Sequence, residues 1–590
     1  MARYRRGVGI LGVDVGGTFT DAVLLEHGEL RTAKVPTASR QTESVLAAAE
    51  AVGARPGTVT RFRHGTTVAT NALLERRGAR TAFVATEGFE HLLHLRRQSR
   101  AHLYRLCDAH PPPLVPVERC TGVGGRMGPD GELAPLDLSS LADLGDAEAI
   151  AVCLLHSYRY PQHEQAVAAE LRRRHPDAHV VASHESAPEF REYERASTTT
   201  VDAYLGPLLG GYLRDLAASS RAAGLPEPLV MRSSGGVVSV QEAAAHAAWA
   251  LLSGPAAGAV GAAFVARQAG VENVIAFDMG GTSTDVCAIV DGEARREHER
   301  VVGGFPVRLP TVAVHTIGAG GGSVVWRDSG GAVRVGPQSA GAHPGPACYG
   351  RGGTRPTVTD ADLLLGRLPL RLAAGLELDR DAAERVFEGL DPEAVVAIVE
   401  AEMLRALRVV SVEQGLDPRD FALVAFGGAG PLHACPLAEE LGIRRVLVPA
   451  AAGVLSAVGL VTGDERRDSV RAFVCPLEEA GELPAEGAAD LRYEGQSFEL
   501  SVPLGPDLAE RFHAAHEARN GYVARDRTIE LVAVRMSDVE RSPAVVVSRA
   551  AAGPGVRGPA MVELDGATCW VPVGWHGASD ESGTLVLERR

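Results

Sequence analysis

The sequence predicts an α/β fold with two similar halves, followed by a small β-rich C-terminal domain. Two nearly identical octapeptides indicate the duplication: Asp-Val-Gly-Gly-Thr-Phe-Thr-Asp at 14–21 and Asp-Met-Gly-Gly-Thr-Ser-Thr-Asp at 278–285. Each octapeptide lies between two apolar runs, which predicts a strand, a tight turn and a second strand. The chain has 590 residues, too many for a single core, so we expect several domains.

The pattern along the chain predicts where these domains begin and end. Over residues 8–183, apolar runs alternate with helical patterns, as they do in α/β units, and the runs at 81–85 and 149–155 predict buried strands. We expect the first half at 8–183, the second half at 184–470 and the β-rich domain at 471–590.

Composition excludes several classes of function. The net charge of −15 disfavours nonspecific binding to nucleic acid or to an acidic membrane. No apolar run is long enough to cross a bilayer. The eight cysteines form no C-x-x-C pair, which favours reduced thiols in the cytoplasm. Lys34 is the only lysine, so a mechanism with a P-loop or Schiff-base lysine is almost excluded.

The two octapeptides carry the residue types that a polyphosphate needs. Glycines let the backbone approach a ligand, threonines and backbone N–H groups can donate to phosphate oxygens, and aspartates can hold a hydrated cation. We expect Asp14 and Asp278 to be catalytic and to face Mg²⁺ through its waters. The expected nucleotide-binding residues are Gly16, Gly17, Thr18, Thr20 and Asp21 in the first turn and Gly280, Gly281, Thr282, Thr284 and Asp285 in the second. Asp21 and Asp285 are equally compatible with structural caps of their hairpins.

A third glycine-rich turn follows the apolar run 421–426. Gly427, Gly428 and Gly430 lie just before a predicted helix, and a strand, glycine loop and helix in this order suit a nucleotide base and ribose at the helix N-terminus. Two phosphate hairpins followed by an adenosine loop resemble the actin, Hsp70 and sugar-kinase superfamily. This order predicts two half-domains that grip one ATP molecule from opposite sides.

Longer motifs resemble the hydantoinase A / 5-oxoprolinase family, which includes N-methylhydantoinase A and the acetone carboxylase β-subunit. The motifs lie at 64–73, 251–258, 315–323, 335–341, 344–350, 357–362 and 425–433, and residues 558–572 resemble the C-terminal end of the family. The resemblance implies an actin-like ATPase fold that uses ATP and Mg²⁺ to phosphorylate a lactam, hydantoin or ketone oxygen. It also implies a separate B-type subunit, and hence a hetero-oligomer.

The resemblance further implies residues on the substrate side, all of which have a structural alternative. These residues are His64, Thr66, Thr67, Asn71, His315, Gly320 and Gly321. A lone histidine is usually structural, and the threonines and Asn71 could instead cap the predicted helix at 68–74.

The chain departs from the family pattern at several positions outside the nucleotide hairpins. Ser234 and Ala313 replace a typical Asn and Asp, and the segment 94–98, which begins with His94, reads His-Leu-Arg-Arg-Gln where Glu-Ile-Gly-Arg-Gln is typical. Glu400 and Glu402 lie in a segment that is typically rich in Asn. These departures concern the substrate rather than the nucleotide.

Three functions are compatible with these features. The first is an ATP-dependent hydrolase subunit that phosphorylates and opens a cyclic amide of the hydantoin or 5-oxoproline type. The alternatives are a subunit of an ATP-dependent ketone carboxylase and a nucleotide-gated scaffold without substrate chemistry. No stretch of the chain corresponds to a B-type subunit, so we expect a partner to complete the reaction.

Overall fold

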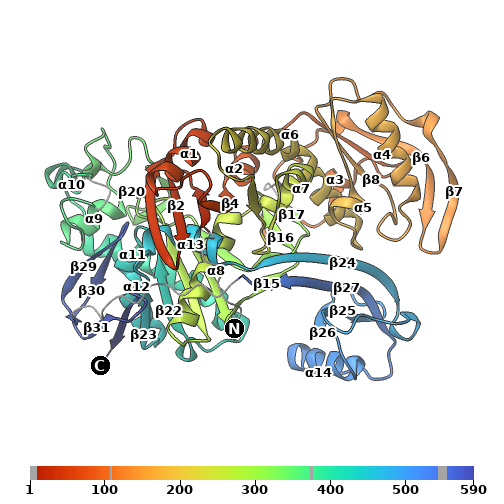
Figure 1. Ribbon diagram of the computed structural model, residues 1–590. Helices are drawn as coiled ribbons and strands as arrows, with labels where there is room; N and C mark the ends of the chain where they lie inside the picture. Colours follow the sequence, from red (N-terminus) through yellow and green to blue (C-terminus); the bar gives the residue numbers. More distant parts are fainter. Residues whose placement is uncertain (1–8, 106–108, 373–375, 543–554, 590) are drawn as a thin grey trace.

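The computed structural model describes residues 9–105, 109–372, 376–542 and 555–589. Within these residues the chain forms two α/β halves, an α/β subdomain inserted into the first half, and a C-terminal lobe (Figure 1). The seven described cysteines are free thiols, and Cys107 lies outside the described residues. In the described parts, no helix is both long and apolar enough to span a membrane.

The first half is built on a sheet with the strand order β11-β10-β4-β1-β2-β3. Strand β1 lies inside this sheet, antiparallel to β2 and parallel to β4, and is buried along nearly its whole length, which explains its continuous apolar run. The elements of this half are β1 (Gly9–Val15), β2 (Phe19–Glu26), β3 (Glu29–Pro36), β4 (Val59–Thr66), β10 (Pro228–Met231), β11 (Val237–Ser239), α1 (Gln41–Ala51), α2 (Val68–Leu74), α6 (Glu192–Ala222) and α7 (Val240–Ala245).

An inserted subdomain with its own sheet interrupts the first half. Its strand order is β7-β6-β5-β8-β9, and β5 and β8 are the two buried strands that the sequence predicts near residues 81 and 149. Its elements are β5 (Thr81–Thr86), β6 (Cys120–Gly128), β7 (Gly131–Asp137), β8 (Ala149–Cys153), β9 (His179–Ala182), α3 (Leu92–Leu95), α4 (Gln162–Arg174) and α5 (Ser183–Ser186). The chain then returns through α6 to β10 and β11, so the first half extends beyond its predicted end at residue 183.

The second half repeats the hairpin arrangement in a larger sheet. Its order is β14-β13-β12-β22-β23-β32-β31-β28, with β19 paired to β13, and β12 is antiparallel to β13 and parallel to β22. Its strands are β12 (Val274–Met279), β13 (Thr284–Val290), β14 (Glu293–Ala294), β19 (Val314–Ile317), β22 (Ala422–Phe426), β23 (Arg445–Val448), β28 (Val556–Arg557), β31 (Trp575–Ser579) and β32 (Leu585–Arg589). Its helices are α8 (Ser253–Gln268), α9 (Val358–Leu364), α10 (Arg380–Val386), α11 (Pro392–Val410), α12 (Gly430–Leu441) and α13 (Leu455–Thr462).

Two-stranded pairs complete the body. They are β15 (Arg296–Glu297) with β18 (Thr311–Val312), β16 (Arg300–Val302) with β17 (Phe305–Val307), β20 (Ser323–Arg327) with β21 (Val333–Ser339), and β29 (Ala560–Leu564) with β30 (Ala567–Val571).

Helices α8 and α13 join the two halves. Ile10, Val23 and Leu25 of the first sheet belong to the same buried cluster as α8, α13 and the second sheet, so the core is continuous across both halves. The two helices pack closely because a Cβ at Gly459 of α13 would overlap the carbonyl of Ala257 in α8. The Gly and Ala content of the segment 251–261 therefore reflects this contact.

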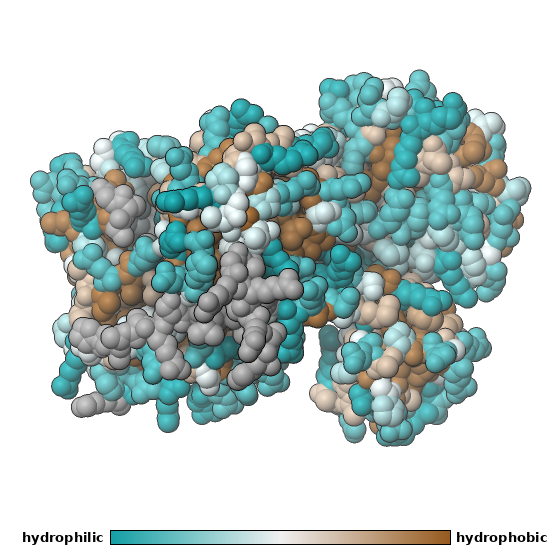
Figure 2. Space-filling model, in the orientation of Figure 1, coloured by the Kyte–Doolittle hydropathy of each residue, from teal (hydrophilic) through white to brown (hydrophobic). Residues whose placement is uncertain are grey.

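The structure divides the predicted C-terminal domain at 471–590 into two parts. A four-stranded lobe contains β24 (Glu465–Pro476), β25 (Ala488–Tyr493), β26 (Leu500–Pro503), β27 (Ile529–Glu540) and α14 (Leu508–Asn520). Strands β24 and β27 form a long ribbon from the body to this lobe (Figure 1), and Figure 2 shows a notch between the lobe and the body. Residues 556–589 instead return to the second half, where β32 pairs with β23 at the edge of the sheet.

A buried ionic cluster fastens the lobe to the body. Arg535 of β27 donates to both carboxylate oxygens of Glu189 at 3.1 and 2.6 Å and to Asp490 Oδ2 at 2.7 Å. Arg308 donates to the same Glu189 carboxylate at 3.0 Å. All four side chains are buried, so each charge depends on the others for compensation.

Replacing Glu189 with Gln is therefore expected to loosen the lobe. The change leaves Arg308 and Arg535 buried without their shared carboxylate, and we expect a loss of about 3–5 kcal/mol of stability. Thermal unfolding and limited proteolysis within residues 465–540 measure this loss. Glu510→Gln, which removes the partner of Arg525 in an exposed pair of the same lobe, is the control and should change neither readout. Equal proteolysis of both variants would contradict the fastening role.

Candidate nucleotide-binding site

The two hairpins have the same backbone geometry. In the strand register, Asp14 lies opposite Asp21 and Asp278 lies opposite Asp285. Each turn closes with an equivalent hydrogen bond, from Gly16 N to Phe19 O and from Gly280 N to Ser283 O, both at 3.0 Å. The similarity of the two octapeptides is thus a similarity of two folded hairpins.

The tips of both hairpins are available to an anion. Gly17 and Gly281 are exposed, and a Cβ at either position would meet no atom within 4 Å. Among the described residues, the N–H groups of Gly17, Thr18, Gly281 and Thr282 have no hydrogen-bond acceptor. Free N–H groups on consecutive residues of a turn are a favourable place for phosphate oxygens.

The first aspartates of the two hairpins lie close enough to interact electrostatically. Asp14 Oδ1 is buried and has no hydrogen-bond partner among the described residues. Burial and the charge of Asp21 raise the pKa of Asp14 to about 7. Burial, Asp285 and then Asp14 raise the pKa of Asp278 to about 8, so the two hairpins act on each other electrostatically. Two crowded carboxylates with an unpartnered oxygen suit a hydrated divalent cation between them.

The third glycine loop lies against the second hairpin. Gly427 has φ +77°, and a Cβ there would overlap Asp278 Oδ1, so the position requires glycine. Ala429 N donates to Met279 O at 3.0 Å, and Gly427 N donates to Ala452 O at 2.9 Å. The loop and the start of α12 therefore lie beside Asp278, where the sequence predicts an adenosine site.

Thr20 and Thr284 differ from their predicted role as phosphate donors. Both are fully buried: Thr20 Oγ1 bonds to Thr37 Oγ1 at 3.0 Å, and Thr284 Oγ1 donates to Ala319 O at 2.6 Å. Side chains alternate between the two faces of a strand, so each threonine faces away from the neighbouring Asp21 or Asp285. This alternation directs both hydroxyls into the protein.

The second aspartates are held by the neighbouring strands. Lys34 Nζ of β3 donates to Asp21 Oδ1 at 2.6 Å, and Thr316 Oγ1 of β19 donates to Asp285 Oδ1 at 2.5 Å. Both carboxylates thus accept hydrogen bonds from protein donors, as structural caps of the hairpins would.

The predicted substrate residues near α2 differ in exposure. His64 is fully buried, with Nδ1 at 3.1 Å from Val13 O and Nε2 at 2.9 Å from Tyr212 OH, and burial lowers the pKa of His64 to about 4. Thr66 is also fully buried. Thr67 and Asn71 are partly exposed and contact each other at 3.4 Å. Of this group, only Thr67 and Asn71 present polar atoms near the surface of the cleft.

The predicted substrate residues near β19 support the second hairpin. Gly321 N donates to Gly280 O at 3.0 Å, and a Cβ at Gly320 would come within 2.7 Å of the backbone of Gly281. Both glycines are buried behind the hairpin. His315 is partly buried on β19, opposite Val286 of β13, and burial, followed by Arg300, lowers the pKa of His315.

The departures from the family pattern lie in several environments. His433 Nδ1 contacts Glu400 Oε1 at 3.0 Å, and Asp362 and Glu400 outweigh burial to raise the pKa of His433 to about 9. Glu402 pairs with Arg405 on the surface. Ser234 is buried and its carbonyl accepts from Arg296, and Ala313 N donates to Arg295 O at 2.8 Å.

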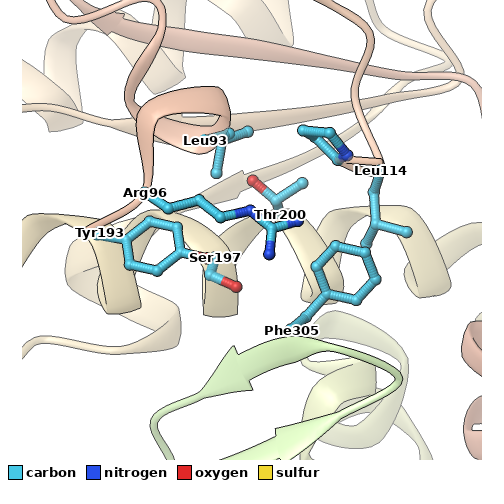
Figure 3. A pocket seen from close by; sticks show the side chains of 8 residues that line it. Leu93, Arg96, Leu114, Tyr193, Ser197, Thr200 and Phe305 are labelled. Atoms are coloured by element: carbon cyan, nitrogen blue, oxygen red, sulfur yellow. The ribbon is translucent and has the colours of Figure 1, made fainter. Parts of the chain in front are cut away.

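The segment 94–98 borders a small cavity between α3, α6 and β17. Figure 3 shows the Arg96 side chain reaching across this cavity toward Thr200. Arg96 has φ +53°, a region that favours glycine, so the substitution of a typical glycine carries backbone strain. The hydroxyls of Ser197 and Thr200 are buried there without a partner among the described residues. The lining residues are Leu93, Arg96, Pro113, Leu114, Tyr193, Ser197, Thr200 and Phe305.

Sequence reasoning missed two contributions to the cleft. A Cβ at Gly254, in the first turn of α8, would lie 3.6 Å from Asp14 Oδ2, so the helix N-terminus is beside the aspartate. The sequence identifies this helix start but not its neighbour. The second contribution is Lys34, whose contact with Asp21 could be predicted from the pairing of the acidic hairpin with the next strand. The described residues hold no group of three or more His, Cys, Asp or Glu side chains placed to bind a metal directly.

Comparison with known proteins identifies the family. The hydantoinase/oxoprolinase model matches residues 195–469, and the model of the hydantoinase/oxoprolinase N-terminal region matches residues 10–175. The chain is 32% identical to caprolactamase subunit alpha of Pseudomonas jessenii, over 98% of each chain. The chain belongs to the hydantoinase/oxoprolinase family.

Other members of the family share large parts of the chain. The solved structure of the ATP-dependent caprolactamase superimposes with a TM-score of 0.85 and 31% identity, covering 98% of this chain and 100% of that one. The acetophenone carboxylase gamma subunit of Aromatoleum aromaticum is 35% identical over 76% of this chain and 67% of its own. The 5-oxoprolinase 1 of Arabidopsis thaliana is 34% identical over 81% of this chain, but only 44% of its own length is matched.

Replacing Asp14 or Asp278 with Asn should stabilise the nucleotide-free protein at pH 8 and abolish stabilisation by Mg-ATP. Burial raises the pKa of Asp14 to about 7 and that of Asp278 to about 8, far above the unfolded value. The folded state therefore keeps protons that the unfolded chain releases, and stability falls as pH rises from about 4 to 8. A neutral amide avoids this loss, and we expect a gain on the order of 1–2 kcal/mol at pH 8.

Thermal unfolding at pH 5 and pH 8, with and without Mg-ATP, measures these effects. The gain from Asn should shrink at pH 5, where the native carboxyls are protonated. Asp137→Asn is the control, and it should lower stability at pH 8 instead of raising it. The hydrogen bonds from Ser139 lower the pKa of this exposed carboxyl, so its charged form stabilises the fold. A Mg-ATP shift retained in both cleft variants would show that these aspartates do not hold the cation.

Proposed function

We propose that this protein is the ATP-binding subunit of an ATP-dependent hydrolase that phosphorylates and opens a cyclic amide of the hydantoin, 5-oxoproline or lactam type. The observation that carries the proposal is the pair of acidic Gly-Gly-Thr hairpins, whose Asp14 and Asp278 face one cleft beside the glycine loop 427–430. Likeness to caprolactamase subunit alpha over the whole of both chains supports a cyclic amide as the substrate.

The duplicated arrangement of the two halves supports an ATPase core of the actin and sugar-kinase type. Each half presents one hairpin to the cleft, and α8 and α13 join the halves below it. In this proposal, N–H groups at the hairpin tips receive phosphate oxygens, and the loop 427–430 receives the adenosine. Asp14 and Asp278 hold hydrated Mg²⁺, which neutralises phosphate charge when it is bound.

The chemistry explains why ATP is needed to open a cyclic amide. Resonance makes the amide carbon a poor electrophile, and its oxygen cannot leave as oxide. Transfer of the γ-phosphoryl group forms an O–P bond at the amide oxygen and breaks the β,γ-anhydride, so that ADP is released. Water then adds to the activated carbon, and the ring C–N bond breaks as the nitrogen takes a proton, which leaves an acyl phosphate. A second water attacks its carbonyl carbon, so that phosphate departs with the original amide oxygen and a carboxylate remains. The transfer itself depends on positioning and charge neutralisation, which rigid hairpins provide.

We assign the substrate side to the start of α2. Thr67 and Asn71 are the predicted substrate residues there with partly exposed polar side chains. Both lie at the carboxyl end of β4, next to the end of β1 that carries Asp14. His64 packs behind them and positions β1 against α6 through Val13 and Tyr212.

A B-type subunit completes the reaction in this proposal, which makes the active form a hetero-oligomer. Two relatives are named as subunits, caprolactamase subunit alpha and the acetophenone carboxylase gamma subunit. The 5-oxoprolinase of Arabidopsis thaliana is more than twice as long as the part that this chain matches, which leaves room there for a second component. The free thiols of the described cysteines agree with a cytoplasmic enzyme.

A ketone carboxylase subunit is the second candidate. It is favoured by the 35% identity with the acetophenone carboxylase gamma subunit. In that reaction, the phosphoryl acceptor is the enol oxygen of a ketone or an oxygen of bicarbonate. The same hairpins would serve both reactions, so the acceptor distinguishes them.

An oxygen-18 experiment tests the proposed function. The purified chain and its B-type subunit are incubated with Mg-ATP and a lactam, hydantoin or 5-oxoproline labelled at the carbonyl oxygen. We expect the label in inorganic phosphate, because the amide oxygen leaves with the phosphoryl group. The chain alone should form no ring-opened product, whereas both subunits together should. Label transfer from a ketone or from bicarbonate, with none from any cyclic amide, would favour the carboxylase.

A further inference from the structure

Lys34, the only lysine of the chain, pairs with the second aspartate of the first hairpin. It belongs to the edge strand β3, and 23% of its side chain is exposed. Its ammonium group donates to Asp21 Oδ1 at 2.6 Å and to Gly453 O at 2.8 Å, and it lies 5.3 Å from the centre of the Phe19 ring. Every other basic side chain is arginine, so the chain places its single compact ammonium group here.

Comparison of the two halves shows that a neutral residue takes the place of Lys34 beside the second hairpin, where Arg300 acts on Asp285 through its charge. Asp21 is paired with Lys34 in the register of β2 and β3, and Asp285 is paired with Thr316 in the register of β13 and β19. The two pairs occupy equivalent places beside the two hairpins. The neutral hydroxyl of Thr316 is therefore sufficient to fix Asp285. Asp21 is instead fixed by the ammonium group of Lys34, which also donates to the carbonyl of Gly453.

The second acceptor of Lys34 lies in a segment far along the chain, in the second half. Gly453 belongs to the short 3₁₀ turn Ala452–Val454, which precedes α13. In the same turn, the carbonyl of Ala452 accepts from Gly427 N at 2.9 Å, and Gly427 adjoins Asp278. One continuous set of contacts thus runs from the first hairpin through Lys34 to the adenosine loop and the second hairpin.

We propose that Lys34 is a positioning residue of the nucleotide site, which ties the first hairpin to the support of the adenosine loop and so sets the spacing of the two hairpins around Mg-ATP. The inference rests on the proposed function only in requiring that the cleft binds Mg-ATP. An ammonium group suits this place because its three donors diverge from one atom toward a carboxylate and a carbonyl. The planar fork of arginine directs its donors differently.

The first experiment compares Lys34→Met, Lys34→Arg, Asp21→Asn and the double variant Asp21→Asn/Lys34→Met with the wild-type chain, in the presence of the B-type subunit. Arg31→Gln is the matched control, because Arg31 lies on the same strand and pairs only with Glu26 on the surface. Calorimetry measures Mg-ATP affinity, and steady-state kinetics give kcat and KM for ATP separately. Thermal unfolding verifies that each variant is folded.

We expect Lys34→Met to lower kcat/KM for ATP by about 10- to 100-fold while the protein stays folded, with Arg31→Gln unchanged. Lys34→Arg should recover part of kcat/KM, because the charge is retained, but not the full rate. The double variant should remain impaired, because it lacks the contact with Gly453. Wild-type behaviour of Lys34→Met would overturn the proposal. Full recovery in the double variant would also overturn it, since Lys34 would then only neutralise Asp21.

The second experiment uses the wild-type chain and therefore does not depend on the folding of a variant. Acetic anhydride can acylate only one lysine, and peptide mass spectrometry separates this reaction from that of the N-terminal amine. We expect saturating Mg-ATP to slow acylation of Lys34, because closure around the nucleotide holds the ammonium group against both acceptors. Equal acylation rates with and without Mg-ATP, in protein that binds Mg-ATP by calorimetry, would overturn the proposed positioning role of Lys34. Absence of Mg-ATP binding would instead refute the proposed function.

Discussion

The structure depends on the juxtaposition of two partly buried aspartates of the same charge in one cleft. Burial raises the pKa of Asp14 and of Asp278, and the charge of Asp14 raises the pKa of Asp278 further. No hydrophobic contact can compensate such a pair, so the surrounding fold must hold the two hairpins together. The continuous core around α8 and α13 does this, because residues of both sheets pack against these helices. The core around α8 and α13 thus offsets the unfavourable burial of the two aspartates, and the folded protein remains stable.

Small residues allow this arrangement at several places. A side chain at Gly459 would separate α13 from α8, and a side chain at Gly427 would displace Asp278. Both positions lie in segments that the sequence marks as glycine-rich, but for different reasons: the first lets two helices touch, and the second frees space beside a carboxylate. The exposed tips at Gly17 and Gly281 serve a third purpose, since they leave backbone N–H groups open to a ligand.

The sequence could predict the parts of the site that are local. The hairpins, the glycine loop before α12 and the pairing of Asp14 with Asp21 all follow from short patterns and strand geometry. The inward direction of Thr20 and Thr284 could have been predicted from strand alternation, since each adjoins an aspartate on the opposite face. The insertion of 81–182 and the return of β32 to β23 could not, because both depend on pairings between segments far apart in the chain. The contact of Lys34 with Gly453 is non-local for the same reason.

The site offers a physical reason for the proposed partner subunit. Hydrolysis of a phosphorylated amide requires a base to activate water, with a pKa near neutrality and a free nitrogen or oxygen. His64 cannot serve, since both ring nitrogens contact protein groups and burial lowers the pKa of His64 to about 4. Asp21 and Asp285 are held by Lys34 and Thr316, and Asp14 and Asp278 are committed to the cation in the proposed site. None of these groups is a free base, which agrees with the proposal that a second subunit supplies the base that activates water.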